Sequence, residues 1–183
     1  MAMRFSLKGI SSLIEESLGE PDTGDEWLET RYQEDTPIIG HTNPYYKAFY
    51  LIAKKYKPKL TVELGSWRAT AAAHIAAGYP SGQVVTIDIH REDQIAQQKT
   101  IRAALHYPNL VYINQWSWDA AEEVASYGPI DILFMDAWHR RDYLEREWRL
   151  YEPLLNTKAL VIMDGLNFLD TVGGNVVEFW DEL

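Results

Sequence analysis

The chain has 183 residues, of which 46% are hydrophobic, and this is enough for a single domain with a buried core. It carries 27 acidic against 17 basic residues, and the formal net charge of −10 disfavours nucleic acid as a partner, because binding a phosphate backbone depends on lysine and arginine. It contains no cysteine, which excludes disulfides, thiolate zinc sites and cysteine nucleophiles. No signal peptide or membrane span is evident, so we expect a cytoplasmic protein without membrane contact.

Residues 1–43 are expected to form an amino-terminal helix and an acidic link, ahead of a main domain over residues 44–183. Four apolar residues at helical spacing predict the helix: Leu7, Ile10, Ile14 and Leu18. The stretch GEPDTGDEWLETRYQEDTP after it is acidic, rich in turn-forming residues and without a period. The main domain then opens with a helix over NPYYKAFYLIAKKY, with Asn43 as its cap and Pro44 at its first position.

Five short apolar runs follow, and they alternate with stretches of helical period: KLTVELG, QVVTIDI, LVYINQ, IDILFMD and ALVIMDG. Runs that are apolar on both faces and separated by helix-length connections are typical of a parallel sheet with helices on each side. The helices are expected at residues 69–78, 93–106, 118–127, 142–155 and 175–183. The sequence therefore predicts an α/β, doubly wound parallel sheet.

The helix expected at residues 142–155 has the clearest pattern. Its apolar stripe consists of Leu144, Trp148, Tyr151 and Leu155. The charged residues Arg146, Glu147 and Arg149 are expected to face elsewhere.

Polar residues end every predicted strand. In chain order they include Glu63, Asp88, Asn114, Asp136 and Asp164. Ligands of open α/β sheets bind beyond the carboxyl ends of the strands, so we interpret these residues as one shared site. The alternative is a set of scattered loop acids, since strand ends meet solvent in any case.

Asp88 ends the second strand, where a carboxylate can accept both hydroxyls of an adenosine ribose. A solvated turn acid or a helix cap is the alternative interpretation. His90, two residues further on, is expected to be solvated.

The stretch LTVELGSWRATAAAHIA predicts a strand, a glycine turn and a helix, which is where a nucleotide cofactor binds. The pyrophosphate of a dinucleotide needs G-x-G-x-x-G, but the second and third glycine positions hold Trp67 and Thr70. A cofactor without phosphate, such as S-adenosylmethionine, needs only the tight turn at Gly65 and acidic groups such as Glu63 to meet its positive charges. The loop therefore favours S-adenosylmethionine over NAD.

These motifs together resemble class I S-adenosylmethionine-dependent methyltransferases over about residues 44–183. The resemblance is closest to the small O-methyltransferases around catechol O-methyltransferase and to the metal-dependent sugar and macrolide O-methyltransferases. VELGSWRAT resembles the first motif in its E-x-G-S-W-x-G form, with Ala69 in place of the last glycine, and VVTIDI resembles the acidic second motif. IDILFMDAWHRRDYLEREWRLYEPLL resembles the family's strand, Asp-x-x-His, helix and W-x-P-L-L, and ALVIMDG resembles the strand after it.

The resemblance implies a Rossmann-like sheet with the strand order 3-2-1-4-5 and methylation of a hydroxyl on a small-molecule substrate. Glu63 and Gly65 would line the methionine end of the cofactor, Asp88 the ribose, and Ser117 the adenine together with Trp116 or Trp138. The full set of cofactor-binding residues that we expect is Glu63, Gly65, Ser66, Trp67, Asp88, Ile89, Trp116, Ser117, Asp136 and Trp138.

In metal-dependent relatives, an Asp at the end of the fourth strand and one at the end of the fifth bind magnesium, which implies Asp136 and Asp164 here. A Lys or His three residues after the first Asp acts as the base, which implies His139. Relatives have an Asn directly after the second Asp, where this chain has Gly165, so the third metal ligand would be Asn167 or another group. Such a site suits methyl transfer, because magnesium and a base both help to ionise a hydroxyl. The alternative is that Asp136 and His139 only form a capped turn before the next helix.

Relatives also carry two further strands after the helix that follows the fifth strand, and we expect these to be missing. The fifth strand would then be an edge, which soluble proteins normally cover. The amino-terminal segment or a second copy could cover it, and the apolar last helix favours a homodimer. For the function, the alternative to an O-methyltransferase is a noncatalytic or non-methylating S-adenosylmethionine-binding protein on the same scaffold.

Overall fold

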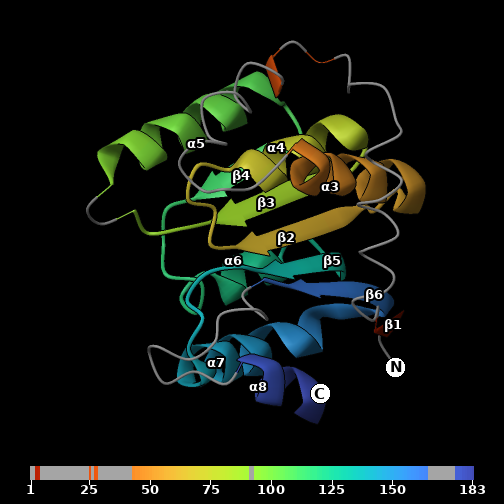
Figure 1. Cartoon of the computed structure of the whole chain (residues 1–183), viewed down its shortest axis with the longest axis vertical. Helices are drawn as coiled ribbons and strands as arrows, with labels where there is room; N and C mark the ends of the chain where they lie inside the picture. Colours follow the sequence, from red (N-terminus) through yellow and green to blue (C-terminus); the bar gives the residue numbers. More distant parts are fainter. Residues whose placement is uncertain (1–2, 5–24, 26, 29–42, 91–92, 165–175) are drawn as a thin grey trace.

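The computed structural model describes residues 3–4, 25, 27–28, 43–90, 93–164 and 176–183. In these residues six parallel strands form one sheet in the order β1-β6-β5-β2-β3-β4 (Figure 1). The strands are β1 Met3–Arg4, β2 Leu60–Leu64, β3 Gln83–Ile87, β4 Leu110–Ile113, β5 Ile130–Met135 and β6 Leu155–Met163. Strands β2 to β6 are the five predicted from the sequence, and they stand in the predicted order 3-2-1-4-5. The α/β, doubly wound fold is therefore confirmed.

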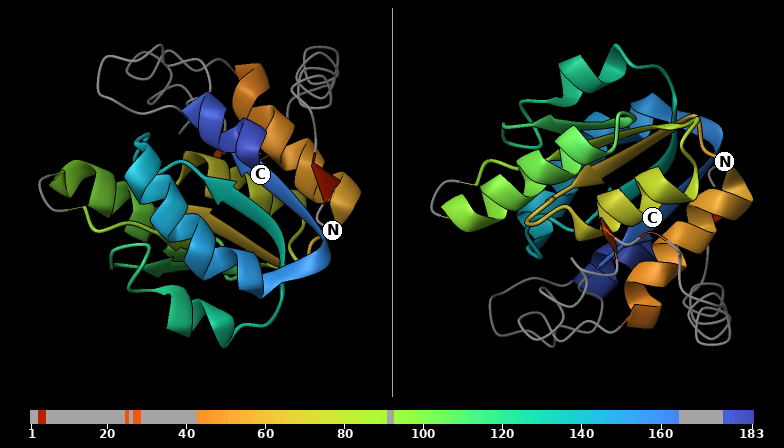
Figure 2. Two further views of the ribbon diagram at one scale, coloured as in Figure 1. Left: turned by 90° about the horizontal axis from the view of Figure 1, so that it is seen from below. Right: turned by 90° about the horizontal axis from the view of Figure 1, so that it is seen from above.

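Helices cover both faces of the sheet, as Figure 2 shows from two sides. One face carries α3 Asn43–Tyr56, α4 Thr70–Gly78 and α5 Gln94–His106, and the other carries α6 Ala121–Ala125, α7 Arg141–Tyr151 and α8 Val176–Glu182. Alternate residues of a strand enter the two cores: Phe134 packs on the first face, and Leu133 and Met135 pack on the second. Because both faces are covered, each of β2 to β6 contains a mainly apolar run, and these runs predicted the strands.

The connection from α7 to β6 differs from the prediction. The helix expected to reach residue 155 ends at Tyr151, and a 3-10 turn follows at Glu152–Leu154. Pro153 has no backbone N–H to continue the α-helix and fits the start of such a turn. Leu155 already belongs to β6, where it pairs with Ile130. The helix expected at residues 118–127 is likewise shorter, since α6 spans Ala121–Ala125.

The amino-terminal segment covers the fifth strand, as one of the two expected alternatives. Met3 pairs with Leu160 and Arg4 with Val161, so β1 adds a parallel strand to β6. A strand that is apolar on both faces and has unpaired backbone groups is stabilised by such a neighbour. The amino-terminal segment thus takes the place that we had given to a second copy, and the homodimer stays a prediction without this reason for it.

The residues described between 25 and 28 pack onto the domain. Leu28 is buried in the core, and the hydroxyl of Tyr107 donates a hydrogen bond of 2.8 Å to Asp25. Trp27 stacks on His106 with ring centroids 4.8 Å apart. This part of the expected acidic link is therefore anchored to α5, whereas the helix predicted around Leu7 to Leu18 lies outside the described residues.

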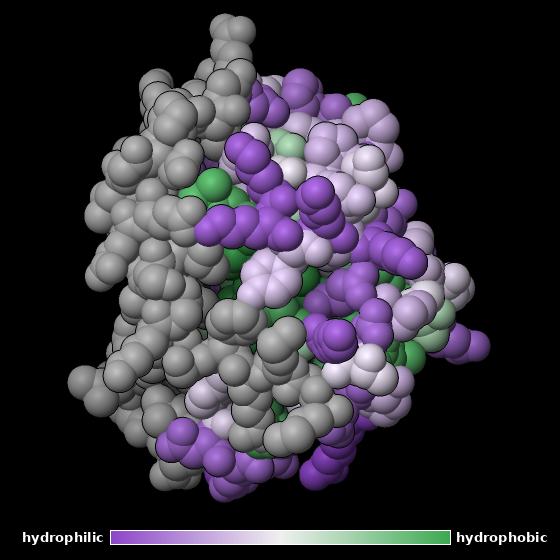
Figure 3. Space-filling view, turned by 90° about the vertical axis from the view of Figure 1, so that its right-hand side faces the viewer, coloured by the Kyte–Doolittle hydropathy of each residue, from purple (hydrophilic) through white to green (hydrophobic). Residues whose placement is uncertain are grey.

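The surface of the described residues is largely polar where Figure 3 shows it. Hydrophilic residues predominate on that side, and hydrophobic ones show in small areas between them. None of the helices in the described part of the chain is long and apolar enough to span a membrane.

Candidate active site

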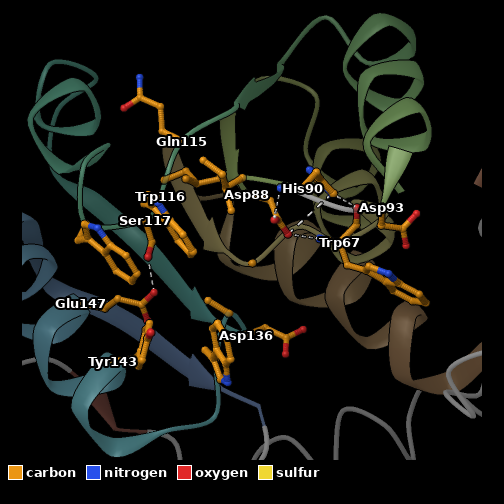
Figure 4. A pocket seen from close by; sticks show the side chains of 16 residues that line it. Trp67, Asp88, His90, Asp93, Gln115, Trp116, Ser117, Asp136, Tyr143 and Glu147 are labelled. Atoms are coloured by element: carbon orange, nitrogen blue, oxygen red, sulfur yellow. Dashed lines mark hydrogen bonds and ion pairs between the residues drawn. The ribbon is translucent and has the colours of Figure 1, made fainter. Parts of the chain in front are cut away.

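A cavity of about 680 Å³ lies beyond the carboxyl ends of β2, β3, β4 and β5, and its size is typical of a small-molecule site (Figure 4). It brings together most of the predicted cofactor residues: Gly65, Trp67, Asp88, Ile89, Trp116, Ser117, Asp136 and Trp138. The remaining two, Glu63 and Ser66, line a smaller hollow of about 50 Å³ that shares Gly65, Trp67 and Asp136 with the cavity.

Gly65 occupies the turn after β2 because two backbone segments meet there. Its φ is +89°, and a Cβ built on it would lie 2.3 Å from the carbonyl oxygen of Asp136 and 2.5 Å from the Cα of Ala137. A glycine is thus required by conformation and by space at this one position. The loop after β5 can approach the loop after β2 only because of it.

We expect Gly65→Ala to shift the loop that carries Asp136 and to lower the free energy of unfolding by at least about 1–2 kcal/mol, the penalty for an L-residue in the left-handed region. Urea unfolding followed by fluorescence measures the change. Gly128→Ala is the matched control, since Gly128 also has a positive φ of 111° but has no atom within 4 Å of the added Cβ. If the two variants lose equal stability, the close contact at Gly65 contributes nothing.

The rest of the loop adopts left-handed conformations without glycine, with φ of 41° at Trp67 and 54° at Ala69. Side chains hold the Trp67 peptide on both sides. Its N–H donates to Asp88 Oδ2 at 2.8 Å, and its carbonyl oxygen accepts from the Thr100 hydroxyl at 2.9 Å and from His90 Nε2. These hydrogen bonds explain how Trp67 can hold a left-handed backbone conformation in a loop that has only one glycine.

His90 is buried, so the prediction that it is solvated is wrong. Its Nδ1 lies 2.7 Å from the hydroxyl of Tyr112, and its Nε2 contacts the carbonyl of Trp67. The neighbouring Asp88 accepts the backbone N–H groups of Trp67 and His90, and its side chain keeps 23% of its surface exposed. Each carboxylate oxygen has room for a second donor, so Asp88 can still accept hydrogen bonds from a ligand.

Glu63 points its carboxyl into the protein from the end of β2. It is 2% exposed, and it accepts a hydrogen bond from the hydroxyl of Thr86. The pKa of Glu63 is raised to about 8, mainly by burial and to a smaller extent by the negative charges of Asp136 and Asp88, while the hydrogen bond from Thr86 acts in the opposite direction. Glu63 is therefore mainly protonated at neutral pH unless a positive charge comes close.

Asp136, His139 and Asp164 lie together beside the cavity, with one candidate ligand atom from each within 4.8 Å of the others. His139 Nε2 is 3.3 Å from Asp136 Oδ1. Burial raises the pKa of Asp136 to about 7, and the hydrogen bond to Asp136 raises the pKa of His139. Two carboxylates and an imidazole at this spacing suit a divalent cation. Asn167, the expected third metal ligand, lies outside the described residues.

A family model described as "Methyltransferase domain" matches residues 62–165, which is more than half of the chain. The chain belongs to the class I S-adenosylmethionine-dependent methyltransferases. The match runs from β2 to the residue after Asp164 and so includes every strand end that lines the cavity. No curated protein sequence matches the chain.

Solved methyltransferases share the fold at low sequence identity. The O-methyltransferase TomG of Streptomyces achromogenes, in complex with SAM, is 17% identical with a TM-score of 0.68, over 87% of this chain and 78% of that one. A putative caffeoyl-CoA O-methyltransferase from Staphylococcus aureus is 17% identical with a TM-score of 0.64, over 86% and 73%. An O-methyltransferase from Bacillus cereus, in complex with SAH, is 19% identical with a TM-score of 0.60, over 85% and 66%.

Glu147 is a residue of this methyltransferase's cavity that the sequence analysis placed elsewhere. It is 1% exposed and accepts a hydrogen bond from the hydroxyl of Ser117 (Figure 4). Burial raises the pKa of Glu147 to about 7. Its position in α7 offered a signal, because residue 147 follows Leu144 by three and precedes Tyr151 by four, which is the spacing of the apolar stripe.

Aromatic side chains line the methyltransferase cavity on the side of β4 and α7. Trp116 and Trp118 stack with centroids 4.7 Å apart, and Trp138 lies over Tyr143 at 5.0 Å. Trp138 is 50% exposed, so its ring is open to contact. Such surfaces suit a flat ring system.

Proposed function

We propose that the protein transfers a methyl group from S-adenosylmethionine to a hydroxyl oxygen of a small molecule. The observation that carries the proposal is the cluster of Asp136, His139 and Asp164, of which Asp136 lines the cavity. The neighbours TomG and the Bacillus cereus protein are O-methyltransferases in complex with SAM or SAH, which supports both the cofactor and an oxygen acceptor.

In the proposed reaction, a bond forms between the substrate oxygen and the methyl carbon while the bond from that carbon to sulfur breaks. The electron pair of the broken bond stays on sulfur, giving S-adenosylhomocysteine, and the hydroxyl proton passes to His139 Nδ1, because Nε2 is the ring nitrogen that faces Asp136. Asp136 accepts a hydrogen bond from His139 and stabilises the imidazolium that results. A divalent cation held by Asp136 and Asp164 would lower the pKa of the substrate hydroxyl.

The test is a methylation assay on a panel of hydroxylated small molecules, with magnesium or with a chelator, in which S-adenosylhomocysteine is the measured product. Methylated product supports the proposal. Calorimetric binding of S-adenosylmethionine with no methyl transfer to any hydroxyl compound of the panel would favour the non-methylating alternative.

Asp88→Ala is expected to weaken binding of S-adenosylhomocysteine by at least about 1 kcal/mol, roughly fivefold in Kd, since it removes charge-assisted acceptors at the cavity. Calorimetry measures both proteins, and Asp142→Ala on the exposed side of α7 serves as the control. Unchanged affinity, or binding of NAD instead, would contradict the assignment.

A further inference from the structure

Glu147 holds one residue of the cavity wall in a single orientation. Its Oε1 accepts a hydrogen bond from the Ser117 hydroxyl, while the Tyr151 hydroxyl donates a hydrogen bond to the Ser117 carbonyl oxygen at 2.6 Å. Both bonds come from α7, so Ser117 is tied to that helix at its side chain and at its backbone. Within the described residues, the buried Oε2 of Glu147 has no hydrogen-bond partner.

This arrangement limits what Ser117 can offer to a ligand. A serine hydroxyl has one proton and two lone pairs, and the proton is already donated to Glu147. Only the lone pairs remain, so Ser117 can accept a hydrogen bond from a bound molecule but cannot donate one. A ligand group that is itself only an acceptor would leave two acceptors facing each other in a partly dry cavity.

The layout of the cavity indicates which part of a ligand meets Ser117, and this step rests on the proposed function. The transferred methyl group must lie near Asp136 and His139, and the ribose hydroxyls suit the free acceptor sites of Asp88. Figure 4 shows Ser117 and Glu147 pointing toward one another on the side of the cavity opposite Trp67. The stacked indole of Trp116 lies on this side, so the flat base of the cofactor belongs here.

We propose that Glu147 is a positioning residue that fixes Ser117 as an acceptor and so selects a cofactor base with an exocyclic amino group over one with a carbonyl oxygen. Glutamine at position 147 can either accept from the Ser117 hydroxyl or donate to it. In the second case the Ser117 O–H points into the cavity, where it can donate a hydrogen bond to a carbonyl oxygen of the base. The carboxylate therefore determines specificity through Ser117, without contact to the base.

The experiment compares two ligands, S-adenosylhomocysteine and its inosine analogue, in which a carbonyl replaces the amino group. Calorimetry is done at pH 8.5, where Glu147 is ionised. We expect the wild type to prefer the adenosine ligand at least about tenfold, because a site built around one hydrogen-bond polarity rejects the opposite one. Glu147→Gln should reduce this preference, the ratio of the two Kd values, to about threefold or less, and Ser117→Ala should reduce it similarly.

Glu145→Gln is the matched control, because it makes the same substitution two residues away on α7, where Glu145 pairs with Arg141. Its ratio should equal that of the wild type, and thermal unfolding checks that all variants are folded. A ratio that is near one in the wild type, or that is unchanged in Glu147→Gln, overturns this inference while the proposed function stands. If the wild type binds neither ligand, the proposed function itself fails and the inference with it.

Discussion

Replacing Asp136 by Asn is expected to lower kcat/KM for methyl transfer at least about 100-fold, or roughly 2.7 kcal/mol of transition-state stabilisation. Asparagine keeps the shape of the side chain but removes the charge that stabilises a protonated His139, which lies 3.3 Å away. It also removes one of the two carboxylates that could hold a cation. Initial rates with the best substrate of the panel give kcat/KM, and calorimetry with S-adenosylhomocysteine shows how much of the loss is due to cofactor binding.

Asp142→Asn is the control for this substitution, since Asp142 is exposed and pairs with Arg140 at 2.9 Å. Its kcat/KM should stay within about twofold of the wild type, as is usual for an exposed ion pair. Asp164→Asn tests the cation-binding role of the cluster apart from the stabilisation of a protonated His139 by Asp136. If a cation takes part, both cluster variants and the chelated wild type lose activity together, and magnesium restores only the wild type. An Asp136→Asn enzyme that retains more than a tenth of the activity would show that the cluster does not carry the reaction.

The sheet could be predicted because its pattern is local and repeated. Each of β2 to β6 is buried on both faces and leaves an apolar run in the sequence, and each run is separated from the next by a helix. β1 could not be found in this way, since Met3 and Arg4 are too few to show a period and they pair with residues more than 150 positions away. For this reason the sequence predicted that the edge would be covered but did not decide between the amino-terminal segment and a second copy.

Most of the cavity was also predictable, because parallel strands bring their carboxyl ends to one side of the sheet. Asp88, Asp136 and Asp164 each follow a recognisable strand, so they could be placed near one another without knowledge of contacts. Contacts between a loop and an element distant in sequence could not be predicted. The bond of Thr100 to the Trp67 carbonyl crosses 33 positions, and neither residue has a neighbour in sequence that indicates the other.

Glu147 shows how a charge can mislead the interpretation of a helical pattern. A glutamate on a helix with arginines on either side is typical of a solvated face, yet this one lies between Leu144 and Tyr151 in the core. It is tolerated there because the hydroxyl of Ser117 meets one of its oxygens and because burial raises its pKa. Its hydrogen-bond partner Ser117 lies 30 positions earlier in the chain. The helical spacing could therefore indicate that Glu147 faces the core, but not which group donates a hydrogen bond to it there.

The ligand-free protein is expected to lose stability as the pH rises from 5 to 8.5, with Glu63 as the largest contributor. The pKa of this carboxyl is raised from 4.5 to about 8 in the folded protein because the side chain is fully buried at the end of β2. Between these values the folded chain keeps a proton that the unfolded chain releases. The stability that Glu63 contributes is thus fully present below pH 4.5 and is lost as the pH rises through 8, by on the order of 5 kcal/mol.

Glu63→Gln isolates this contribution, because glutamine keeps an acceptor for the Thr86 hydroxyl and cannot ionise. Glu147 also has a raised pKa and weakens the wild type over the same range, but it does so equally in both proteins. Asp136 interacts electrostatically with Glu63, so it ionises more easily in Glu63→Gln, which adds to the difference in the same direction. Urea unfolding at pH 5.5, 7 and 8.5 should therefore give a difference in favour of Glu63→Gln that grows with pH. A difference that stays constant across the three pH values would mean that Glu63 ionises in the folded protein as easily as in the unfolded chain, and that its carboxylate meets a compensating positive charge before any cofactor arrives.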